Sequence, residues 1–144
     1  MNFKIENETT KSFPIVDDGF LEETGFSWVS IQTKYGIFTG TAKVHPEDFA
    51  KGWYNSLAGQ MIAHHRAYIK YFKYRKRLDQ NTLKELNHIY CTNSHDSSIA
   101  NCIFERMCEL EANIDQLFTN ITLFEQRIQE KILGLEEYYS ARNN

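Results

Sequence analysis

The stretch with the most evident chemistry interleaves cations with aromatic rings, in the order Arg66-Ala67-Tyr68-Ile69-Lys70-Tyr71-Phe72-Lys73-Tyr74-Arg75-Lys76-Arg77. Cations neutralise phosphate and aromatic faces stack on bases, so this stretch could hold a nucleotide or a nucleic-acid strand. The same alternation also arises on an amphipathic helix with a buried aromatic face and a solvated basic face. A formal net charge of −3 provides no positive field for long nucleic acid, whereas a small phosphorylated ligand needs only a few well-placed cations.

A second group of reactive side chains surrounds Cys91. His88, Cys91 and His95, with Cys102 beyond, offer nitrogen and sulfur ligands for one zinc ion, but their spacing matches no standard zinc module. Cys91 beside a histidine could form a thiolate pair, yet no oxyanion hole and no Gly-x-Ser-x-Gly elbow accompany it. The sequence also has no P-loop and no Gly-x-Gly-x-x-Gly motif. We therefore predict no metal site, no cofactor and no enzymatic activity.

The composition bounds the class of protein. A chain of 144 residues is long enough for one domain with a real core, and we predict a single domain over 1–144. Three cysteines without a C-x-x-C pair favour a reducing compartment. The first eight residues mix charges and lack the apolar run of a signal peptide, and no stretch approaches the roughly 20 apolar residues of a membrane span. These features predict a cytoplasmic protein that makes no membrane contact.

The N-terminal part of the chain has the pattern of a small antiparallel sheet. Residues 1–25 are polar and acidic, and we predict an irregular arm or a short edge strand there. Residues 26–33 and 37–44 are rich in β-branched and aromatic residues, and Gly36 between them can adopt the positive φ of a tight turn. Gly40 inside the second strand suggests a bulge or a close approach of another backbone. The sequence predicts a β-hairpin over residues 26–44.

The rest of the chain, residues 46–140, has helical periodicity. Pro46 suits the first position of a helix, and Gly52 is a candidate interruption. A second helix is predicted from Asn55 to about Leu78, with Leu57, Met61, Tyr68, Ile69 and Phe72 near one face. Asp79-Gln80-Asn81 resembles a turn, and Thr82 with Glu85 resembles a capping box for a further short helix. A polar linker then follows at residues 91–95.

The last predicted helix runs from about Asp96 to Ser140 and carries a heptad seam. The seam repeats at alternating steps of four and three, as in a coiled coil; it consists of Ile103, Met107, Leu110, Ile114, Leu117, Ile121, Phe124, Ile128, Lys131 and Leu135. Such a helix would be about 65 Å long, whereas a compact domain of this size is roughly 37 Å across. The helix therefore breaks, near Thr119-Asn120 or Gly134, or packs on a second copy of the chain. An antiparallel pairing with the basic helix 66–77 is also predicted.

This order of elements resembles a known family. The segment Thr33-Lys34-Tyr35-Gly36-Ile37-Phe38-Thr39-Gly40-Thr41-Ala42, then His45-Pro46-Glu47-Asp48 and Arg66-Ala67-Tyr68-Ile69-Lys70-Tyr71, is similar to a hairpin-plus-helices family in phages of Gram-positive bacteria. Over about residues 26–140 the chain resembles the first-described Thoeris anti-defence proteins. The resemblance implies an α+β fold with an N-terminal hairpin or small sheet and long antiparallel helices, the last one coiled-coil-like. It also implies a non-enzymatic sponge in the bacterial host cytoplasm that binds cyclic ADP-ribose isomers or cyclic oligonucleotides and assembles as a homo-oligomer.

The candidate binding residues come from ligand chemistry, because the family's binding residues cannot be aligned position by position. A cyclic dinucleotide-like ligand needs cations for its phosphates, flat side chains for its base and amides for the base edge. The predicted ligand-binding residues are Arg66, Lys70, Tyr90, Asn93, Asn101, Phe104, Arg106 and Arg127. Two alternatives remain open: a helical interaction protein that inhibits or scaffolds a host protein, and a nucleic-acid-binding phage accessory protein that uses helix 66–77.

Overall fold

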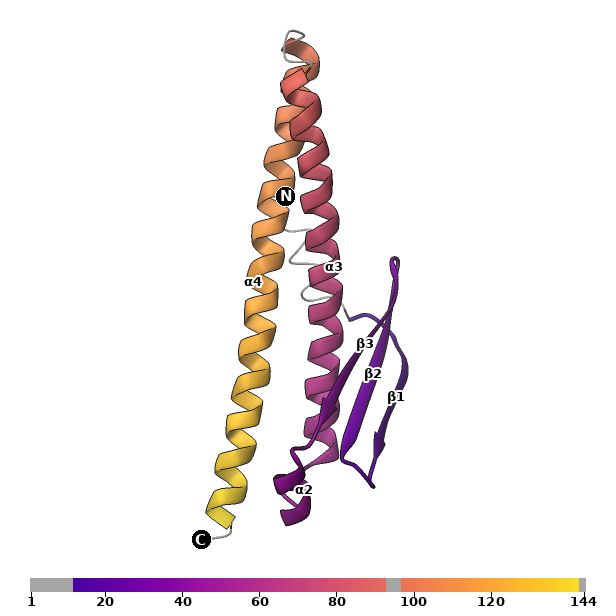
Figure 1. Ribbon diagram of the computed structural model, residues 1–144, viewed down its shortest axis with the longest axis vertical. Helices are drawn as coiled ribbons and strands as arrows, with labels where there is room; N and C mark the ends of the chain where they lie inside the picture. Colours follow the sequence, from indigo (N-terminus) through magenta and orange to yellow (C-terminus); the bar gives the residue numbers. More distant parts are fainter. Residues whose placement is uncertain (1–11, 93–96, 143–144) are drawn as a thin grey trace. The chain divides into compact units, whose positions relative to one another are not determined.

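The computed structural model describes residues 12–92 and 97–142, which form a three-stranded sheet, a short helix and two long helices (Figure 1). These residues fall into two compact units. One consists of residues 13–71 and 122–142, and the other consists of Ser12 with residues 72–92 and 97–121. Both long helices pass through both units, and the single domain over residues 1–144 stays a prediction. The α+β fold class is confirmed, with the sheet first and the helices after it.

The sheet is antiparallel with strand order β1-β2-β3, formed by β1 (Ile15–Leu21), β2 (Phe26–Thr33) and β3 (Gly36–Lys43). The predicted hairpin is confirmed, because Thr33 pairs with Gly36 around a tight turn and Gly36 has a φ of 117°. Part of the predicted arm is an edge strand, β1, which pairs with β2 from Leu21↔Phe26 to Ile15↔Ile31. Residues 1–11 of that arm lie outside the described residues.

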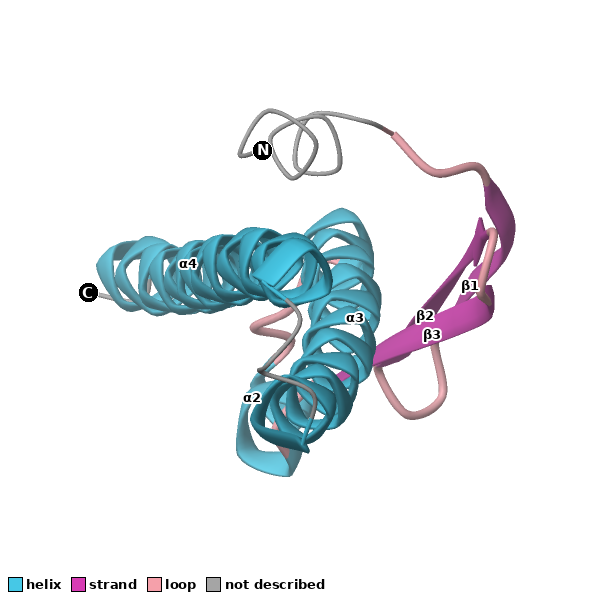
Figure 2. Ribbon diagram, turned by 90° about the horizontal axis from the view of Figure 1, so that it is seen from above, coloured by secondary structure: helices cyan, strands magenta, loops and turns pink. Residues whose placement is uncertain are grey.

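Side chains alternate between the two faces of β2. Ser27, Val29 and Ile31 lie on the buried face, and Phe26 and Trp28 lie half-buried on the opposite face. Figure 2 shows α3 beside the sheet, so the buried face of β2 and its neighbours forms the core of this unit together with the N-terminal half of α3.

The connection from the sheet to the long helices is built from local capping signals. In α2 (Pro46–Lys51), Pro46 occupies the first turn and the His45 side chain accepts a hydrogen bond from the Glu47 N–H at 3.2 Å. Gly52 ends this helix in the left-handed conformation with a φ of 73°, so the predicted interruption is confirmed. The Asn55 side-chain oxygen then accepts the Leu57 and Ala58 N–H groups and caps α3 (Ser56–Thr92).

A stripe of small residues lets α3 approach the sheet closely. Gly59, Ala63 and Ala67 follow one another at steps of four and therefore share a helix face. A Cβ on Gly40 of β3 would overlap the Ala63 carbonyl oxygen and the Ala67 nitrogen. Because the β2–β3 register is unbroken at Gly40, this glycine marks a close backbone approach and not a bulge. Of the five residues predicted near one face of this helix, Tyr68, Ile69 and Phe72 are buried. Leu57 and Met61 are 69% and 48% exposed.

The turn predicted at Asp79-Gln80-Asn81 is wrong, and so is the separate helix capped by Thr82. Helix α3 continues without a break to Thr92. The Thr82 hydroxyl donates to the Leu78 carbonyl oxygen at 3.0 Å, a bond that forms within a helix and not at its start. Residues 79–82 contain no glycine or proline, and the half-buried Leu78, Leu83 and Leu86 pack on both sides of them. Of the predicted linker, Cys91 and Thr92 are helical, and residues 93–95 lie outside the described part of the chain.

The last helix, α4 (Ser97–Arg142), confirms the predicted span and has no break at Thr119-Asn120 or at Gly134. All ten residues of the heptad seam are buried or half-buried within the single chain. The burial removes the argument that the seam needs a second copy of the protein, although a homo-oligomer formed through other surfaces stays a prediction.

The two long helices are antiparallel neighbours within each unit. In the unit of residues 72–92 and 97–121, the Lys76 ammonium lies 5.3 Å from the Phe118 ring centre and the Tyr90 and Phe104 rings are 6.2 Å apart. In the other unit, the His65 and Phe124 rings are 5.1 Å apart. The predicted antiparallel pairing of the two helices is therefore confirmed in both. No described helix is long and apolar enough to cross a membrane.

Candidate functional site

The structure distributes the predicted binding residues over both units. Arg66, Lys70 and Arg127 belong to the unit of residues 13–71 and 122–142. Tyr90, Asn101, Phe104 and Arg106 belong to the other unit, and Asn93 lies outside the described residues. The predicted residues therefore form two groups, one in each unit.

The group around Tyr90 is open to solvent. The Tyr90 ring is half-buried against Phe104, which is itself 54% exposed, and Asn101 is exposed. Arg106 already binds Glu109, with 3.0 Å between a guanidinium nitrogen and a carboxylate oxygen, and both side chains are about half exposed. A hollow in this unit, formed by Asn81, Lys84, Glu85, His88 and Ile89, comprises one face of a single helix. None of the described residues of the Tyr90 group lines this hollow.

In the other unit, Arg66, Lys70 and Arg127 have different surroundings. The Lys70 side chain is exposed to solvent, and the Arg127 guanidinium carbon lies 5.2 Å from the Phe124 ring centre. Arg66 is half-buried and donates a hydrogen bond to the Thr41 carbonyl oxygen at 2.9 Å. It also lines a cavity of about 250 Å³, and it is the one predicted residue among those described that does so.

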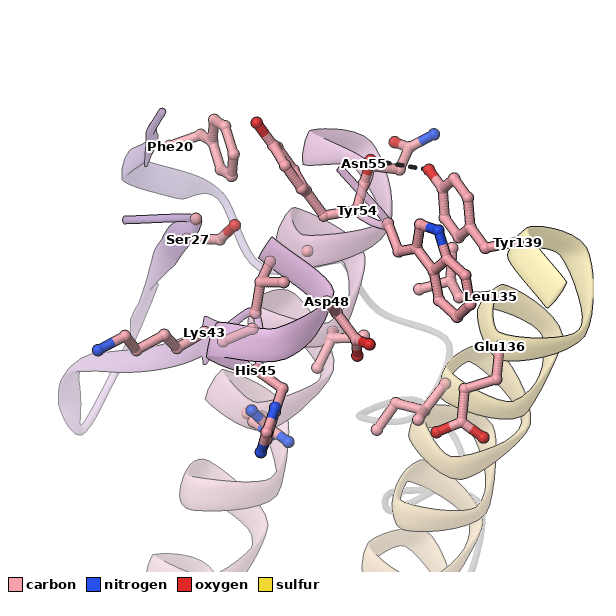
Figure 3. Close-up of a pocket in the computed structure, with 18 residues that line it drawn as sticks. Phe20, Ser27, Lys43, His45, Asp48, Tyr54, Asn55, Leu135, Glu136 and Tyr139 are labelled. Carbon is pink, nitrogen blue, oxygen red and sulfur yellow. Dashed lines mark hydrogen bonds between the residues drawn. The ribbon is translucent and has the colours of Figure 1, made fainter. Parts of the chain in front are cut away.

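This cavity lies between the inner face of the sheet, the α2–α3 connection and the last turns of α4 (Figure 3). Its wall combines aromatic rings, three basic side chains, two carboxylates and a serine. The lining residues are Phe20, Gly25, Ser27, Ala42, Lys43, Val44, His45, Asp48, Trp53, Tyr54, Asn55, Gly59, Ile62, Arg66, Ile132, Leu135, Glu136 and Tyr139. They all belong to the unit of residues 13–71 and 122–142.

Ring contacts hold the aromatic wall in place, and one of them involves Phe49, which does not line the cavity. The Tyr54 ring contacts Phe49, at 5.1 Å and nearly parallel, and Phe20, at 6.1 Å. The Tyr139 hydroxyl donates to the Tyr54 carbonyl oxygen at 2.7 Å, and the Tyr139 ring is nearly parallel to Trp53 (Figure 3). These contacts tie the end of α4 to the α2–α3 connection and fix the shape of the cavity.

Charged groups of both signs line the cavity. Lys43 and Arg66 come from the end of β3 and from α3, and Asp48 and Glu136 come from α2 and α4. The His45 imidazole, which accepts the Glu47 N–H, also lines the cavity. Cations suit phosphate oxygens, and carboxylates accept hydrogen bonds from ribose hydroxyls. The cavity therefore offers partners for both polar parts of a nucleotide, and its apolar and aromatic wall suits the base.

The Ser27 hydroxyl has an unusual environment. The residue is 1% exposed, its Oγ has no hydrogen-bond partner among the described residues, and it lines the cavity. Leaving a buried hydroxyl unsatisfied costs about 1–3 kcal/mol. The sequence around Ser27 does not indicate a binding role, because small polar residues are common in strands.

His64 is a second buried polar group of the same unit. Burial lowers the pKa of His64 below its ordinary value of 6.5, and the neighbouring His65 lowers that pKa further. Its Nε2 is buried without a hydrogen-bond partner among the described residues, and its ring lies 5.2 Å from the Tyr68 ring. The environment therefore favours the neutral imidazole.

We expect His64 to make the folded state less stable in mild acid. Since its folded-state pKa is lowered, the unfolded chain binds more protons as the pH falls below 6.5. The resulting loss of stability is complete once the pH lies below the folded-state pKa. Urea unfolding of the wild type and His64→Gln from pH 8 to pH 5 should show a smaller loss in the variant. His65→Gln should show an intermediate loss, because it removes the smaller of the two causes that lower the pKa of His64. Equal profiles for the wild type and His64→Gln would contradict the assignment.

Among the described residues, no group of three or more histidine, cysteine, aspartate or glutamate side chains is placed to bind a metal ion. Cys91 and Cys102 are exposed thiols, and the histidine at position 95 lies outside the described residues. Comparisons of the chain with protein-family models, curated proteins and solved structures find no match. The cavity and the sequence resemblance are therefore the two observations that bear on function.

Proposed function

We propose that this chain is a phage anti-defence protein that binds and sequesters a cyclic nucleotide immune signal without degrading it. The ligand class is a cyclic ADP-ribose isomer or a cyclic oligonucleotide, as the resemblance to Thoeris anti-defence proteins implies. The proposal includes the cytoplasm of the bacterial host as the location and a homo-oligomer as the assembly.

The observation that carries the proposal is the composition of the cavity wall. Aromatic rings, basic side chains and carboxylates line a cavity of about 250 Å³ in one unit of the chain. Ligand sites are typically apolar concavities of about 300–1,000 Å³ with a few polar groups, and this cavity lies just below that range. It therefore suits one nucleoside part of a larger ligand, with the remainder outside.

Calorimetry tests the proposal with a panel of cyclic ADP-ribose isomers and cyclic di- and trinucleotides. We expect stoichiometric binding of at least one member, and release of the intact compound when the complex is heated, as checked by mass spectrometry. Absence of binding across the panel, or recovery of a hydrolysed product, would contradict the proposal.

Arg66→Ala should weaken binding of that compound about tenfold or more, because a charge-assisted hydrogen bond contributes about 1.5–3 kcal/mol. Lys70→Ala is the control, since Lys70 lies one turn further along the same helix, is exposed and does not line the cavity. Arg106→Ala reports on the other unit, where Arg106 is paired with Glu109. If Arg106→Ala abolishes binding and Arg66→Ala does not, the ligand binds outside the cavity.

The alternative is an interaction protein that inhibits or scaffolds a host protein. Large apolar side chains that α4 exposes favour it; they are Ile99 at 50%, Phe104 at 54%, Phe118 at 59%, Leu133 at 47% and Tyr138 at 52%. Capture of one host protein in stoichiometric amount, together with no binding of the nucleotide panel, would select this alternative.

A further inference from the structure

The buried Ser27 hydroxyl needs an explanation that the fold does not supply. Ser27 and Ser30 lie on the same strand and are both buried, at 1% and 6% exposure. The Ser30 hydroxyl is 2.7 Å from the Thr39 hydroxyl and shares a hydrogen bond with it. The Ser27 Oγ has no partner among the described residues, and Figure 3 shows it beside the cavity, below Phe20. The Ser30 hydroxyl thus has a hydrogen-bond partner within the protein, and the Ser27 hydroxyl has none among the described residues.

The helix opposite Ser27 leaves room for its hydroxyl. A Cβ on Gly59 of α3 would lie 2.5 Å from the Ser27 Oγ, so any larger residue at position 59 would press on it. Gly59 therefore gives the hydroxyl its space where the helix and the sheet meet. A glycine inside a helix lowers stability by about 1 kcal/mol relative to alanine. Gly59 is therefore a second unfavourable feature beside the unpaired Ser27 hydroxyl.

We propose that Ser27 is a specificity-determining residue that hydrogen-bonds the edge of one nucleobase of the ligand inside the cavity. This inference rests on the proposed function. A serine hydroxyl both donates and accepts, so it can pair with a ring nitrogen or with an exocyclic group of a base. In a site that excludes water, an unpaired hydroxyl discriminates strongly between ligands that satisfy it and ligands that do not.

The surroundings of Ser27 fit a flat, mostly apolar ring. Phe20, Val44 and Ile62 contribute apolar side chains to the same cavity. Asp48 and Glu136 line it too, where they can accept hydrogen bonds from the ribose hydroxyls of the same nucleoside. An inorganic phosphate would make no favourable contact with the apolar side chains, and the two carboxylates would repel it. The cavity therefore favours a nucleoside over a small inorganic anion.

Two matched serine variants test the assignment with cyclic ADP-ribose and with its inosine analogue, which carries a carbonyl in place of the adenine amino group. Ser27→Ala should weaken binding of cyclic ADP-ribose about tenfold and should narrow the affinity ratio between the two compounds. Its melting temperature should equal or exceed that of the wild type, because the substitution removes an unsatisfied polar group. Ser30→Ala should lower the melting temperature, because it breaks the bond to Thr39, and should leave both affinities within twofold of the wild type.

The outcomes separate this inference from the proposed function. If the wild type binds cyclic ADP-ribose and Ser27→Ala keeps both the affinity and the ratio, Ser27 does not contact the base and the inference is overturned while the proposed function stands. If Ser27→Ala loses affinity and also melts at a lower temperature, the hydroxyl has a structural role and the inference is likewise overturned. If the wild type binds neither compound and no member of the cyclic nucleotide panel, both are wrong.

Discussion

Gly40→Ala is expected to lower the free energy of unfolding by about 3 kcal/mol, the upper end of the usual range for inserting a methyl group into a packed interior. The reason is the identity of the atoms that the new Cβ would meet. They are the carbonyl oxygen of Ala63 and the nitrogen of Ala67, and these backbone atoms cannot rotate away as a side chain does. Gly40 has no left-handed φ, so the cost comes from contact and not from backbone strain. Urea unfolding followed by circular dichroism measures it.

Gly134→Ala is the matched control for this substitution. A Cβ on Gly134 would meet no atom within 4 Å, and the residue lies in the interior of α4. Alanine there should raise the free energy of unfolding by about 0.5–1 kcal/mol, because it restricts the unfolded chain and favours the helix. A Gly40→Ala protein as stable as the wild type would mean that α3 does not lie against β3 at this point. In that case the proposed cavity would not exist as described, because Ala42 of β3 and Gly59 of α3 form part of its wall.

The parts of the fold that the sequence predicted correctly depend on local signals. The hairpin follows from two β-branched, aromatic stretches around Gly36, and the register confirms it residue by residue. The span of α4 follows from its heptad repeat, which holds over ten positions. In both cases neighbouring residues carry enough information, since each element is defined by its own periodicity.

The turn at residues 79–81 shows where local signals fail. Asp-Gln-Asn followed by Thr-x-x-Glu imitates a turn and a capping box, but helix propensities of such residues differ by only about 0.7 kcal/mol at most. Packing of the leucines on either side outweighs this difference, and α3 continues. The buried face near the start of α3 was also missed, because glycine and alanine carry little hydrophobic weight. A hydropathy pattern selects Leu57, which is 69% exposed, instead of Ala63, which is fully buried.

The candidate site could not be read from the sequence for a related reason. Ser27 and Tyr139 are more than a hundred positions apart, and only the pairing of the sheet, α3 and the end of α4 within one unit brings them to the same cavity. Arg66 was found because its basic, aromatic context is a local feature. Ser27, Trp53, Tyr54 and Tyr139 have no such context, so their role emerges from tertiary structure alone.

The heptad seam provides the second large expected effect. Leu117 is fully buried, and Leu117→Ala should lower the free energy of unfolding by about 3 kcal/mol, within the range of leucine deletions in a core. Because the seam is buried within one chain, this loss should not depend on protein concentration and the oligomeric state should not change. Urea unfolding at several concentrations and sedimentation velocity measure both quantities.

Phe118→Ala is the control for the adjacent, outward position. Phe118 is 59% exposed beneath the Lys76 ammonium, and its removal should change stability by about 1 kcal/mol or less. A homo-oligomer that forms through exposed apolar side chains of α4 would dissociate more readily in Phe118→Ala and not in Leu117→Ala. The reverse result, with association lost in Leu117→Ala and its stability dependent on concentration, would mean that the seam is shared between chains. Comparison of the two variants therefore shows whether the heptad seam of α4 packs within one chain or between chains.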